Sequence, residues 1–154
     1  MPILANLLEL YAHDFSEFHP VELGEDGRYC YPALPLYWSE AGRFPFLLRI
    51  DSKLAGFVLV KRGSEFSDDL AVLDVVEFFV LRAYRKRGVG TLAAHEVWKR
   101  MPGPWQVRVM ESNVAALSFW TKAISRFAGD SVRACHVHKD GARWSVFSFN
   151  SKML

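Results

Sequence analysis

The stretch Glu77-Phe-Phe-Val-Leu-Arg-Ala-Tyr-Arg-Lys-Arg-Gly-Val-Gly-Thr91 carries an apolar strand through a basic loop into a helix. The loop holds the cations of Arg85–Arg87, and it enters the helix through Gly88 and Gly90. The N–H groups of a first helical turn have no partners within the helix, and the helix dipole adds partial positive charge there. A glycine lets an anion approach these N–H groups closely, because it has no Cβ. The stretch therefore predicts a phosphate-binding loop, and a pyrophosphate is the expected ligand.

Other kinds of phosphate-binding loop fit the stretch less well. A P-loop requires Gly-Lys-Ser/Thr at the start of the helix, and Gly88–Thr91 contains no lysine. Gly88–Ala93 satisfies the dinucleotide-binding pattern G-x-G-x-x-A, with Glu111 about 20 residues further on. In that fold the first glycine follows the strand almost directly, whereas Arg82–Arg87 intervene here. The cations also fit a solvated loop or a nucleic-acid contact, and these two alternatives stay open.

Two segments resemble the motifs of a known family. Arg85-Lys-Arg-Gly88-Val-Gly90 matches Q/R-x-x-G-x-G/A, the acyl-CoA pyrophosphate motif of the GNAT superfamily of N-acetyltransferases. Asn113-Val-Ala-Ala116-Leu-Ser-Phe119-Trp120-Thr-Lys122 resembles a second family motif, N-x-x-A-x-x-F-Y-x-K, at the expected interval. The resemblance implies an α/β fold with a mixed sheet of about six or seven strands, helices on both faces and splayed central parallel strands.

Length and composition indicate one ordinary globular domain over 1–154. We expect a variable acceptor-binding half over 1–70, an acyl-CoA-binding core over 72–126 and a C-terminal hairpin over 131–150. Hydrophobic residues make up 51% of the chain, and the formal charge of +2 does not suit a protein that coats nucleic acid. The cysteines, Cys30 and Cys135, lie far apart and predict reduced thiols in a cytoplasmic protein. Neither a metal-ligand pattern nor a membrane-spanning run is found in the sequence.

Hydrophobic periodicity and turn signals predict the order of the elements. Helices are expected over roughly 3–18, around Tyr37 and Trp38, over 88–100 and over 113–126. Strands are expected over 46–50, 54–60, 72–81, 105–110, 132–137 and 143–149. The near-continuous apolar run at 72–81 is typical of a central strand that is covered on both faces.

The resemblance implies acyl transfer from acetyl-CoA to an amine. The cofactor would lie between the strands at 72–81 and 105–110, with the Val80 N–H as the donor to its thioester carbonyl. The basic loop would bind the pyrophosphate through backbone N–H groups and basic side chains. The residues assigned to cofactor binding are Phe79, Val80, Leu81, Arg85, Lys86, Arg87, Gly88, Val89, Gly90, Thr91, Asn113 and Trp120.

The amine must lose a proton before it can attack, because alkylammonium groups have pKa values of about 10. Glu77 is the leading candidate base, since an acid within an apolar strand should have a raised pKa. Its alternative role is that of a structural carboxylate. Glu111, at the end of the partner strand, is the second candidate, with solvation or helix capping as its alternative.

The leaving thiolate needs a proton, and here the sequence departs from the family pattern. Trp120 occupies the position that usually carries a tyrosine acid, and an indole N–H cannot deliver a proton near neutral pH. Trp120 is expected to pack against the pantetheine arm or in the core. Ser118, Tyr84 or a water molecule could assist instead, and a thiolate can also leave without full protonation.

Three functions remain open from the sequence. The first is an N-acetyltransferase that acts on a small-molecule or peptide amine, without nucleic-acid or membrane partners. The resemblance is compatible with a homodimer. The second is a catalytically silent acyl-CoA-binding module, which the tryptophan at 120 would explain. The third is a nucleic-acid-binding protein that uses Arg82–Arg87. Tyrosines of the first half, including Tyr11 and Tyr31, could line an acceptor pocket or belong to an aromatic core.

Overall fold

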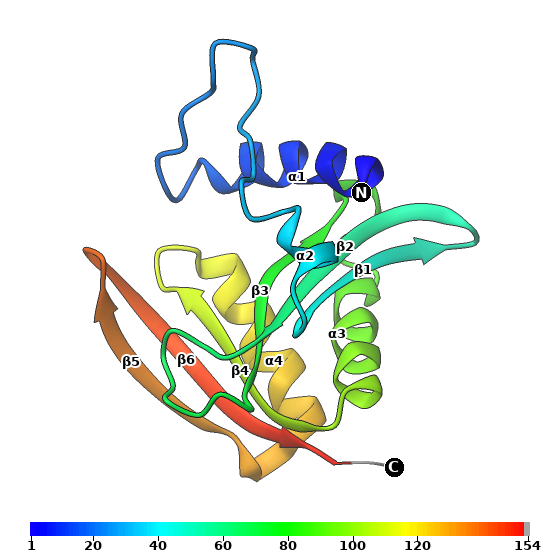
Figure 1. Cartoon of the computed structure of the whole chain (residues 1–154). Coiled ribbons are helices and arrows are strands. Elements are labelled where there is room, and N and C mark those ends of the chain that lie inside the picture. Colours follow the sequence, from blue (N-terminus) through cyan, green and yellow to red (C-terminus); the bar gives the residue numbers. More distant parts are fainter. Residues whose placement is uncertain (153–154) are drawn as a thin grey trace.

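The structure is a computed structural model that describes residues 1–152. Its six strands form one mixed sheet in the order β1-β2-β3-β4-β6-β5 (Figure 1). The strands are β1 (Arg43–Ile50), β2 (Lys53–Arg62), β3 (Leu73–Val80), β4 (Gly103–Met110), β5 (Arg133–Lys139) and β6 (Ala142–Ser151). The helices are α1 (Pro2–Phe15), α2 (Leu36–Ser39), α3 (Val89–Arg100) and α4 (Val114–Ala128), with 3-10 turns at Arg82–Tyr84 and Gly129–Ser131. The expected fold class is confirmed.

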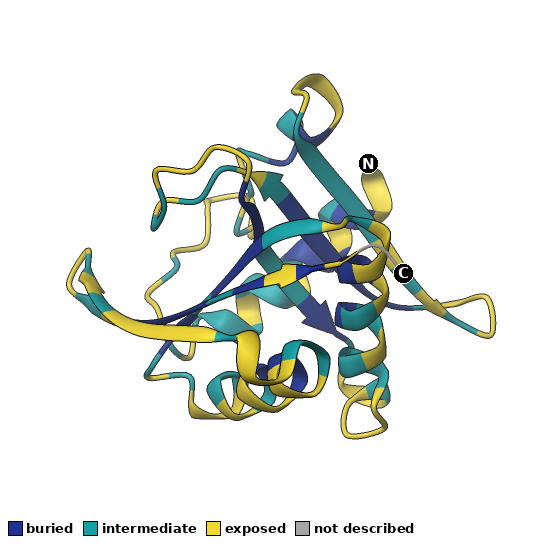
Figure 2. Cartoon of the chain, turned by 90° about the horizontal axis from the view of Figure 1, so that it is seen from below, coloured by how far each residue is buried: buried dark blue, intermediate teal, exposed yellow. Residues whose placement is uncertain are grey.

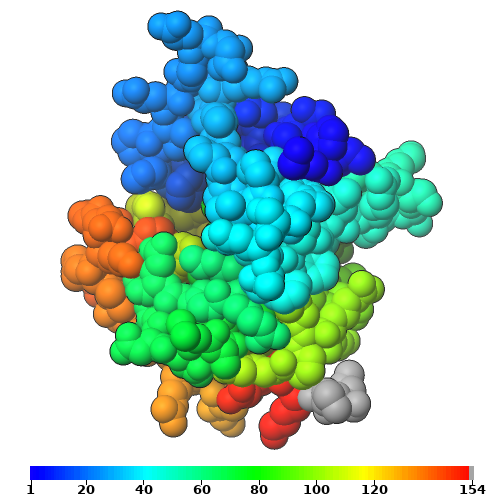
Figure 3. Space-filling model, viewed as in Figure 1, coloured from blue at the N-terminus to red at the C-terminus, as the bar shows by residue number. Residues whose placement is uncertain are grey.

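Helices cover both faces of the sheet, as the sequence predicts. Helices α3 and α4 enclose the larger hydrophobic core, and α1 and α2 pack on the opposite face over β2 and β3. Figure 2 shows the buried residues along the middle of the sheet and the exposed ones at the hairpin tips. The segment between α1 and α2 projects from one end of the molecule (Figures 1 and 3). No helix within residues 1–152 has the length and apolar character needed to cross a membrane.

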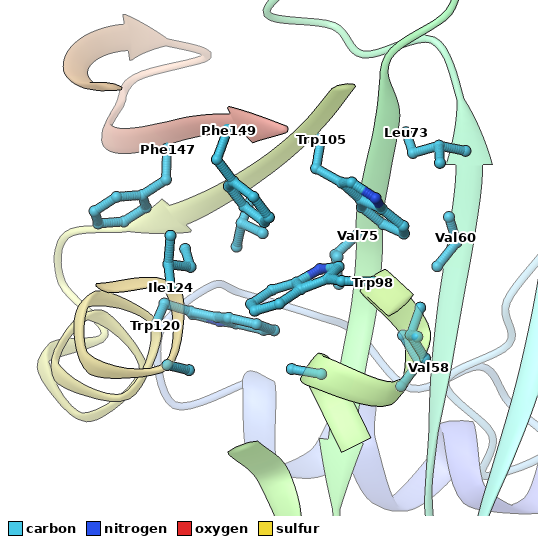
Figure 4. Close-up of a cluster of buried hydrophobic side chains, with 14 of the residues drawn as sticks. Val58, Val60, Leu73, Val75, Trp98, Trp105, Trp120, Ile124, Phe147 and Phe149 are labelled. Carbon is cyan, nitrogen blue, oxygen red and sulfur yellow. The ribbon is translucent and has the colours of Figure 1, made fainter. Parts of the chain in front are cut away.

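Aromatic side chains fill the larger core. Trp98 of α3 and Phe149 of β6 meet edge to face, with ring centroids 4.8 Å apart (Figure 4). Trp120 of α4 joins them and is only 7% exposed. Its ring lies edge to face against Phe78 of β3, with centroids 4.8 Å apart. The structure therefore places Trp120 in the core, where large rings contribute most to burial, and its packing against the pantetheine arm stays a prediction.

The central strands β3 and β4 are parallel but diverge. They pair only at Leu73↔Trp105 and Asp74↔Gln106. Beyond these pairs β3 continues along β2 and β4 continues along β6, so the two strands leave a gap between them. This divergence is the splay that the family resemblance implies. It leaves the facing backbone edges of both strands without partners from a neighbouring strand.

A bulge in β3 determines the side of the sheet on which Glu77 lies. Leu59 of β2 pairs with Glu77, whereas the next residue, Val60, pairs with Val75, so Val76 is an extra residue without a partner. Such an insertion interrupts the alternation of side chains along a strand. Asp74 and Glu77 therefore share the face that α1 covers, although three positions separate them.

Gly56 allows strand β2 to approach β3 closely at the C-terminal end of β3, where Gly56 pairs with Val80. A Cβ on Gly56 would lie 1.9 Å from the carbonyl oxygen of Phe79. We expect Gly56→Ala to lower the free energy of unfolding by about 1–3 kcal/mol, as overpacking does. Thermal unfolding followed by circular dichroism measures the change. Gly103→Ala is the matched control, because Gly103 also has a positive φ but has open space where its Cβ would lie. Equal losses in both variants would mean that the close approach is not the cause.

Candidate active site

A cavity of about 520 Å³ opens where β3 and β4 diverge. Its walls come from both strands, from α1 and the segment that follows it, from α4 and from β6. The lining residues used below are Tyr11, Tyr31, Glu77, Arg108, Asn113, Trp120 and Trp144. A partly apolar cavity with a few convergent polar groups is the usual form of a small-molecule site.

Glu77 lies in this cavity and is held by two tyrosines. The Tyr11 hydroxyl of α1 donates to Oε2 of Glu77, and the Tyr31 hydroxyl donates to Oε1 at 3.0 Å. Burial raises the pKa of each tyrosine, and the adjacent Glu77 carboxylate raises it further. Both phenols therefore stay protonated and act as hydrogen-bond donors. They fix the orientation of the carboxylate without a formal charge.

The surroundings of Glu77 suit a general base. Burial raises the pKa of its carboxyl above the usual value, and the two tyrosine hydroxyls and the Arg108 charge only partly oppose the shift. A raised pKa brings a carboxylate closer to the basicity that proton abstraction near neutral pH requires. Glu77, the leading candidate base from the sequence, thus lies in the cavity and has a raised pKa.

Among Phe79, Val80 and Leu81 of the segment that ends β3, one backbone N–H faces the gap. The Leu81 N–H donates to the Ala55 carbonyl at 2.8 Å, so it points toward β2. N–H groups alternate in direction along a strand, so Phe79 also faces β2 while Val80 faces the gap. The N–H groups of Phe79 and Leu81 therefore point toward β2, which does not support their predicted role as backbone donors to the cofactor. Of the three predicted residues, only Val80 is placed to act as the donor.

The loop before α3 presents unpaired N–H groups. Lys86 and Gly88 both have left-handed backbone conformations, with φ of 61° and 77°. Within residues 1–152, the N–H groups of Lys86, Arg87, Gly88, Val89, Gly90 and Thr91 donate to no protein acceptor. Successive N–H groups in such turns form a concave anion site, and the helix dipole adds to it. The geometry fits a phosphate group.

The two glycines of the loop have different roles. A Cβ on Gly88 would meet nothing within 4 Å, so this position is open to a ligand and needs glycine for its positive φ. A Cβ on Gly90 would lie 3.0 Å from the ring of Phe119 in α4. Gly90 therefore allows α3 to pack closely on α4, and this packing role was not anticipated from the sequence.

The Arg85 side chain contacts protein groups instead of facing the loop. Its Nε donates to the Val80 carbonyl at 2.7 Å, and its Nη2 lies 2.7 Å from Oδ2 of Asp14 in α1. Arg82 binds the other oxygen of Asp14 at 2.6 Å. Arg85 thus joins α1 to the end of β3, which does not support direct phosphate binding by its guanidinium. Lys86 and Arg87 are exposed and form no ion pair within residues 1–152, so they are the cations free to meet phosphates.

Asp14→Asn tests this junction. Burial alone would raise the pKa of Asp14, but the Arg85 and Arg82 guanidinium groups hold it below the usual value. A lowered folded-state pKa adds stability above the unfolded pKa of about 3.9, and this stability is lost as the pH falls. We expect the variant to lose no more than about 1 kcal/mol at pH 7, because the pair is partly exposed. Urea unfolding should show the deficit shrinking from about pH 5 downward. A deficit that is constant with pH would contradict the ion-pair explanation.

Helix α4 presents one face to the cavity. Asn113 caps the helix, since its side chain accepts from the Ala116 N–H at 3.0 Å, and Ala116 and Trp120 follow on the same face. Ser118 lies elsewhere on the helix surface, is exposed and does not line the cavity. The suggestion that Ser118 assists the leaving thiolate is therefore not supported by its position.

Glu111 is bound to the C-terminal hairpin. Its carboxylate contacts Nδ1 of His136 at 2.5 Å, the Ser145 hydroxyl at 3.0 Å and Nε of Arg143 at 3.0 Å. Burial opposes the shift, but these partners hold the pKa of Glu111 below its usual value. A carboxylate with a lowered pKa is a weaker base, and Glu111 does not line the cavity. Its position therefore favours a structural role over the predicted role as second base.

Three partners of the site could not be assigned from the sequence. The sequence predicts Tyr11 and Tyr31 only as pocket or core residues, because their bonds to Glu77 depend on tertiary packing. Arg108 of β4 also lines the cavity, where it pairs with the buried Asp74 at 3.4 Å. Its only signal in the sequence is a cation within an apolar strand. Among residues 1–152, no cluster of three or more His, Cys, Asp or Glu side chains could hold a metal ion.

The chain belongs to the acetyltransferase (GNAT) family, because a model of that family matches residues 4–124. This match includes the basic loop, Glu77 and most of α4. It confirms the family that the two sequence motifs resemble. No curated protein matches the sequence at a significant level.

Solved structures share the fold at low sequence identity. A GNAT-family protein from Desulfovibrio desulfuricans is 13% identical, with a TM-score of 0.68 and 99% of this chain and 95% of that chain covered. NAA60 of Arabidopsis thaliana, solved with a bisubstrate analogue, is 20% identical, with a TM-score of 0.60 and coverage of 97% and 93%. An acetyltransferase from Bacillus subtilis, solved with CoA, is 10% identical, with a TM-score of 0.53 and coverage of 75% and 82%. At these identities the likeness supports the fold alone.

Proposed function

We propose that this protein is an N-acetyltransferase that moves the acetyl group of acetyl-CoA to a primary amine, with Glu77 as the general base. The single observation that carries the proposal is the position of Glu77. It lies in a cavity at the divergence of β3 and β4, and the end of β3 leads into a loop of unpaired N–H groups. Family membership supports acetyl-CoA as the cosubstrate, as does the CoA bound in the Bacillus subtilis structure.

The residues fit the cosubstrate in two places. Backbone N–H groups over 86–91 would bind the pyrophosphate, with Lys86 and Arg87 as countercharges. The gap between β3 and β4 would hold the pantetheine arm, with the Val80 N–H directed at the thioester oxygen. When bound, the thioester supplies an activated acyl carbon for nucleophilic attack.

Glu77 removes a proton from the acceptor ammonium, which otherwise stays charged near neutral pH because its pKa is about 10. The neutral nitrogen then forms a bond to the acyl carbon, and the bond from that carbon to sulfur breaks. The nitrogen loses a second proton as the amide forms. One of the two protons ends on the CoA thiolate and the other passes to solvent, so the reaction is balanced.

Water relays one of these two protons to the thiolate in this scheme. Thiols have pKa values of about 8.5, so the thiolate is a tolerable leaving group at neutral pH. Trp120 is buried against Phe78 and Phe119, and its indole cannot deliver a proton. The absence of a tyrosine at this position is also the observation that favours the second candidate function, a catalytically silent acyl-CoA-binding module.

Release of CoA distinguishes the two functions. Purified protein is mixed with acetyl-CoA and a panel of small amines, amino acids and short peptides, and free thiol is measured over time. The proposed function predicts amine-dependent thiol release that is lost in Glu77→Gln. Tight binding of acetyl-CoA with no release above background for any amine would contradict enzymatic activity and support the silent module.

A further inference from the structure

We propose that Arg108 binds a carboxylate of the acceptor, so that the preferred substrate is an amine with a carboxylate close to its amino group, as in an α-amino acid. This inference rests on the proposed function, because it concerns the acceptor of the same site. It assigns Arg108 as a residue that determines specificity. The alternative role of Arg108 is a purely structural ion pair with Asp74.

Arg108 and Glu77 lie opposite each other across the gap. The last paired residues of the two strands are Asp74 and Gln106. Arg108 lies two residues beyond Gln106 in β4. Glu77 lies three residues beyond Asp74 in β3, but Val76 is the extra residue of the bulge, so Glu77 is only two pairing positions beyond Asp74. Both residues are therefore at about the same height, roughly 7 Å beyond the last pair at about 3.3 Å per residue. They share the sheet face that α1 covers, so a small molecule in the cavity can meet both.

Most of the hydrogen-bonding capacity of Arg108 is unused. Its only protein acceptor within residues 1–152 is Oδ2 of Asp74, which lies 3.4 Å from Nε. The side chain is 17% exposed, and the Nη atoms are not among the buried polar atoms that lack a partner. They therefore reach solvent-accessible space, and Arg108 lines the cavity. A guanidinium with two free nitrogens matches the planar, bidentate geometry of a carboxylate.

The surroundings hold the guanidinium in place. The centroids of the Phe66 and Trp144 rings lie 6.0 and 5.9 Å from its Cζ. Asp74 is fully buried, and its carboxylate accepts a hydrogen bond from Nε at one edge of the Arg108 guanidinium. An arginine fixed on one edge and over two rings loses little conformational entropy when a ligand binds its other edge.

The charges of the cavity match a zwitterion. Glu77 would contact the amino end of the acceptor and Arg108 the carboxylate end, so each charged end of the ligand meets the opposite charge. The Coulombic effects of Arg108 and Glu77 on each other's pKa values are consistent with their proximity. Phe15, Tyr31 and Trp144 also line the cavity, which favours an acceptor with an apolar or aromatic side chain.

Matched acceptors test the inference. A set of apolar and aromatic α-amino acids, including L-phenylalanine, is compared with the corresponding carboxamides and with 2-phenylethylamine, using thiol release from acetyl-CoA. The best amino acid is expected to exceed its carboxamide in kcat/KM by about 10-fold or more, as for a charge-assisted hydrogen bond. The amine of the carboxamide is less basic and more readily deprotonated, so amine basicity cannot produce this preference.

Variants of Arg108 show whether the preference depends on its guanidinium. Arg108→Lys keeps the charge but not the planar fork, and it should reduce the preference for the carboxylate. Arg108→Gln should abolish the preference, mainly through a higher KM for the amino acid. The double variant Asp74→Asn/Arg108→Gln removes the buried charge as well, and should behave likewise if Arg108→Gln alone folds poorly. Arg143→Gln, an arginine outside the cavity, should leave the preference unchanged.

Two results would overturn the inference while the proposed function stands. One is a carboxamide or 2-phenylethylamine that is acetylated as efficiently as the amino acid. The other is a preference that survives in folded Arg108→Gln. A protein that binds acetyl-CoA but acetylates no amino acid of the set also contradicts it. Failure to bind acetyl-CoA would instead count against the proposed function. In that case, thermal shift with L-phenylalanine and its carboxamide tests Arg108 directly, and an equal shift for both ligands rejects the inference.

Discussion

Glu77→Gln is expected to lower kcat/KM for the acceptor by about 100- to 10,000-fold, the usual contribution of a general base. The glutamine amide keeps the shape of the side chain, and its oxygen can accept from one of the two tyrosine hydroxyls while its NH2 donates to the other hydroxyl oxygen. It cannot take a proton from the acceptor ammonium. Steady-state thiol release from acetyl-CoA measures the loss, and titration with acetyl-CoA should show that cosubstrate affinity is nearly unchanged.

The pH dependence gives this prediction a second test. Activity requires the ionised form of Glu77, so wild-type kcat/KM should rise with pH through the raised pKa of this group. The rise should be absent in Glu77→Gln. Replacing Tyr31 with phenylalanine removes one donor that stabilises the carboxylate, so the pKa of Glu77 should rise further. The activity profile of Tyr31→Phe should therefore shift to higher pH without the full loss seen in Glu77→Gln.

Stability distinguishes lost chemistry from lost structure. The pKa of Glu77 is raised in the folded protein, so its favourable contribution is present below the unfolded value of about 4.3. That contribution is lost as the pH rises through the folded pKa. Near neutral pH the buried charge costs stability, and Glu77→Gln should unfold at the same temperature as wild type or above it. An inactive variant that is also unfolded would not support the catalytic role.

Glu111→Gln is the matched control for Glu77→Gln. It makes the same chemical change at the second candidate base, which contacts His136, Arg143 and Ser145 outside the cavity. We expect its kcat/KM to stay within about threefold of wild type, since surface changes away from a site have small effects. A large loss in Glu111→Gln with retained activity in Glu77→Gln would reverse the two assignments.

Gly88→Asp is expected to weaken acetyl-CoA binding by about 100-fold, or about 2.8 kcal/mol. Two effects combine in this change. The aspartate adds a negative charge where the pyrophosphate would lie, and its Cβ occupies the open space over the unpaired N–H groups. Calorimetric titration with acetyl-CoA measures the dissociation constant of each variant.

Gly63→Asp controls for the backbone strain of that substitution. Gly63 has φ of 79°, Gly88 has φ of 77°, and neither has a neighbouring atom within 4 Å of a built Cβ. The two changes therefore impose similar strain and add the same charge, but Gly63 lies in the segment after β2, away from the basic loop. Binding should be nearly unchanged in Gly63→Asp. An equal loss in both variants would show that general destabilisation, and not the loop, explains the effect.

The sequence predicted the features that depend on local patterns. The apolar run at 72–81, the glycines at 88 and 90 and the cap at Asn113 identified β3, the basic loop and the start of α4. Glu77 could be proposed as the base because an acid within an apolar strand should have a raised pKa. These inferences need only the neighbours of a residue along the chain.

Features that depend on register and tertiary contacts could not be predicted. The direction of the Phe79, Val80 and Leu81 backbone follows from the pairing with β2, which no local pattern specifies. The motif position of Arg85 predicts phosphate binding, but the partner of its side chain, Asp14, lies 71 residues away in the sequence. The cavity partners of Glu77 come from α1 and from the segment that follows it, so only the folded chain brings them together.

The most direct measurement is a calorimetric titration of the purified protein with acetyl-CoA and with CoA at moderate salt. A protein that holds the cosubstrate between β3 and β4 should bind both ligands with dissociation constants in the micromolar range, and Gly88→Asp should lose most of this affinity. The absence of binding to either ligand would contradict the assignment of the loop and the gap as an acyl-CoA site. That result would instead favour the hypothesis that the basic loop contacts nucleic acid.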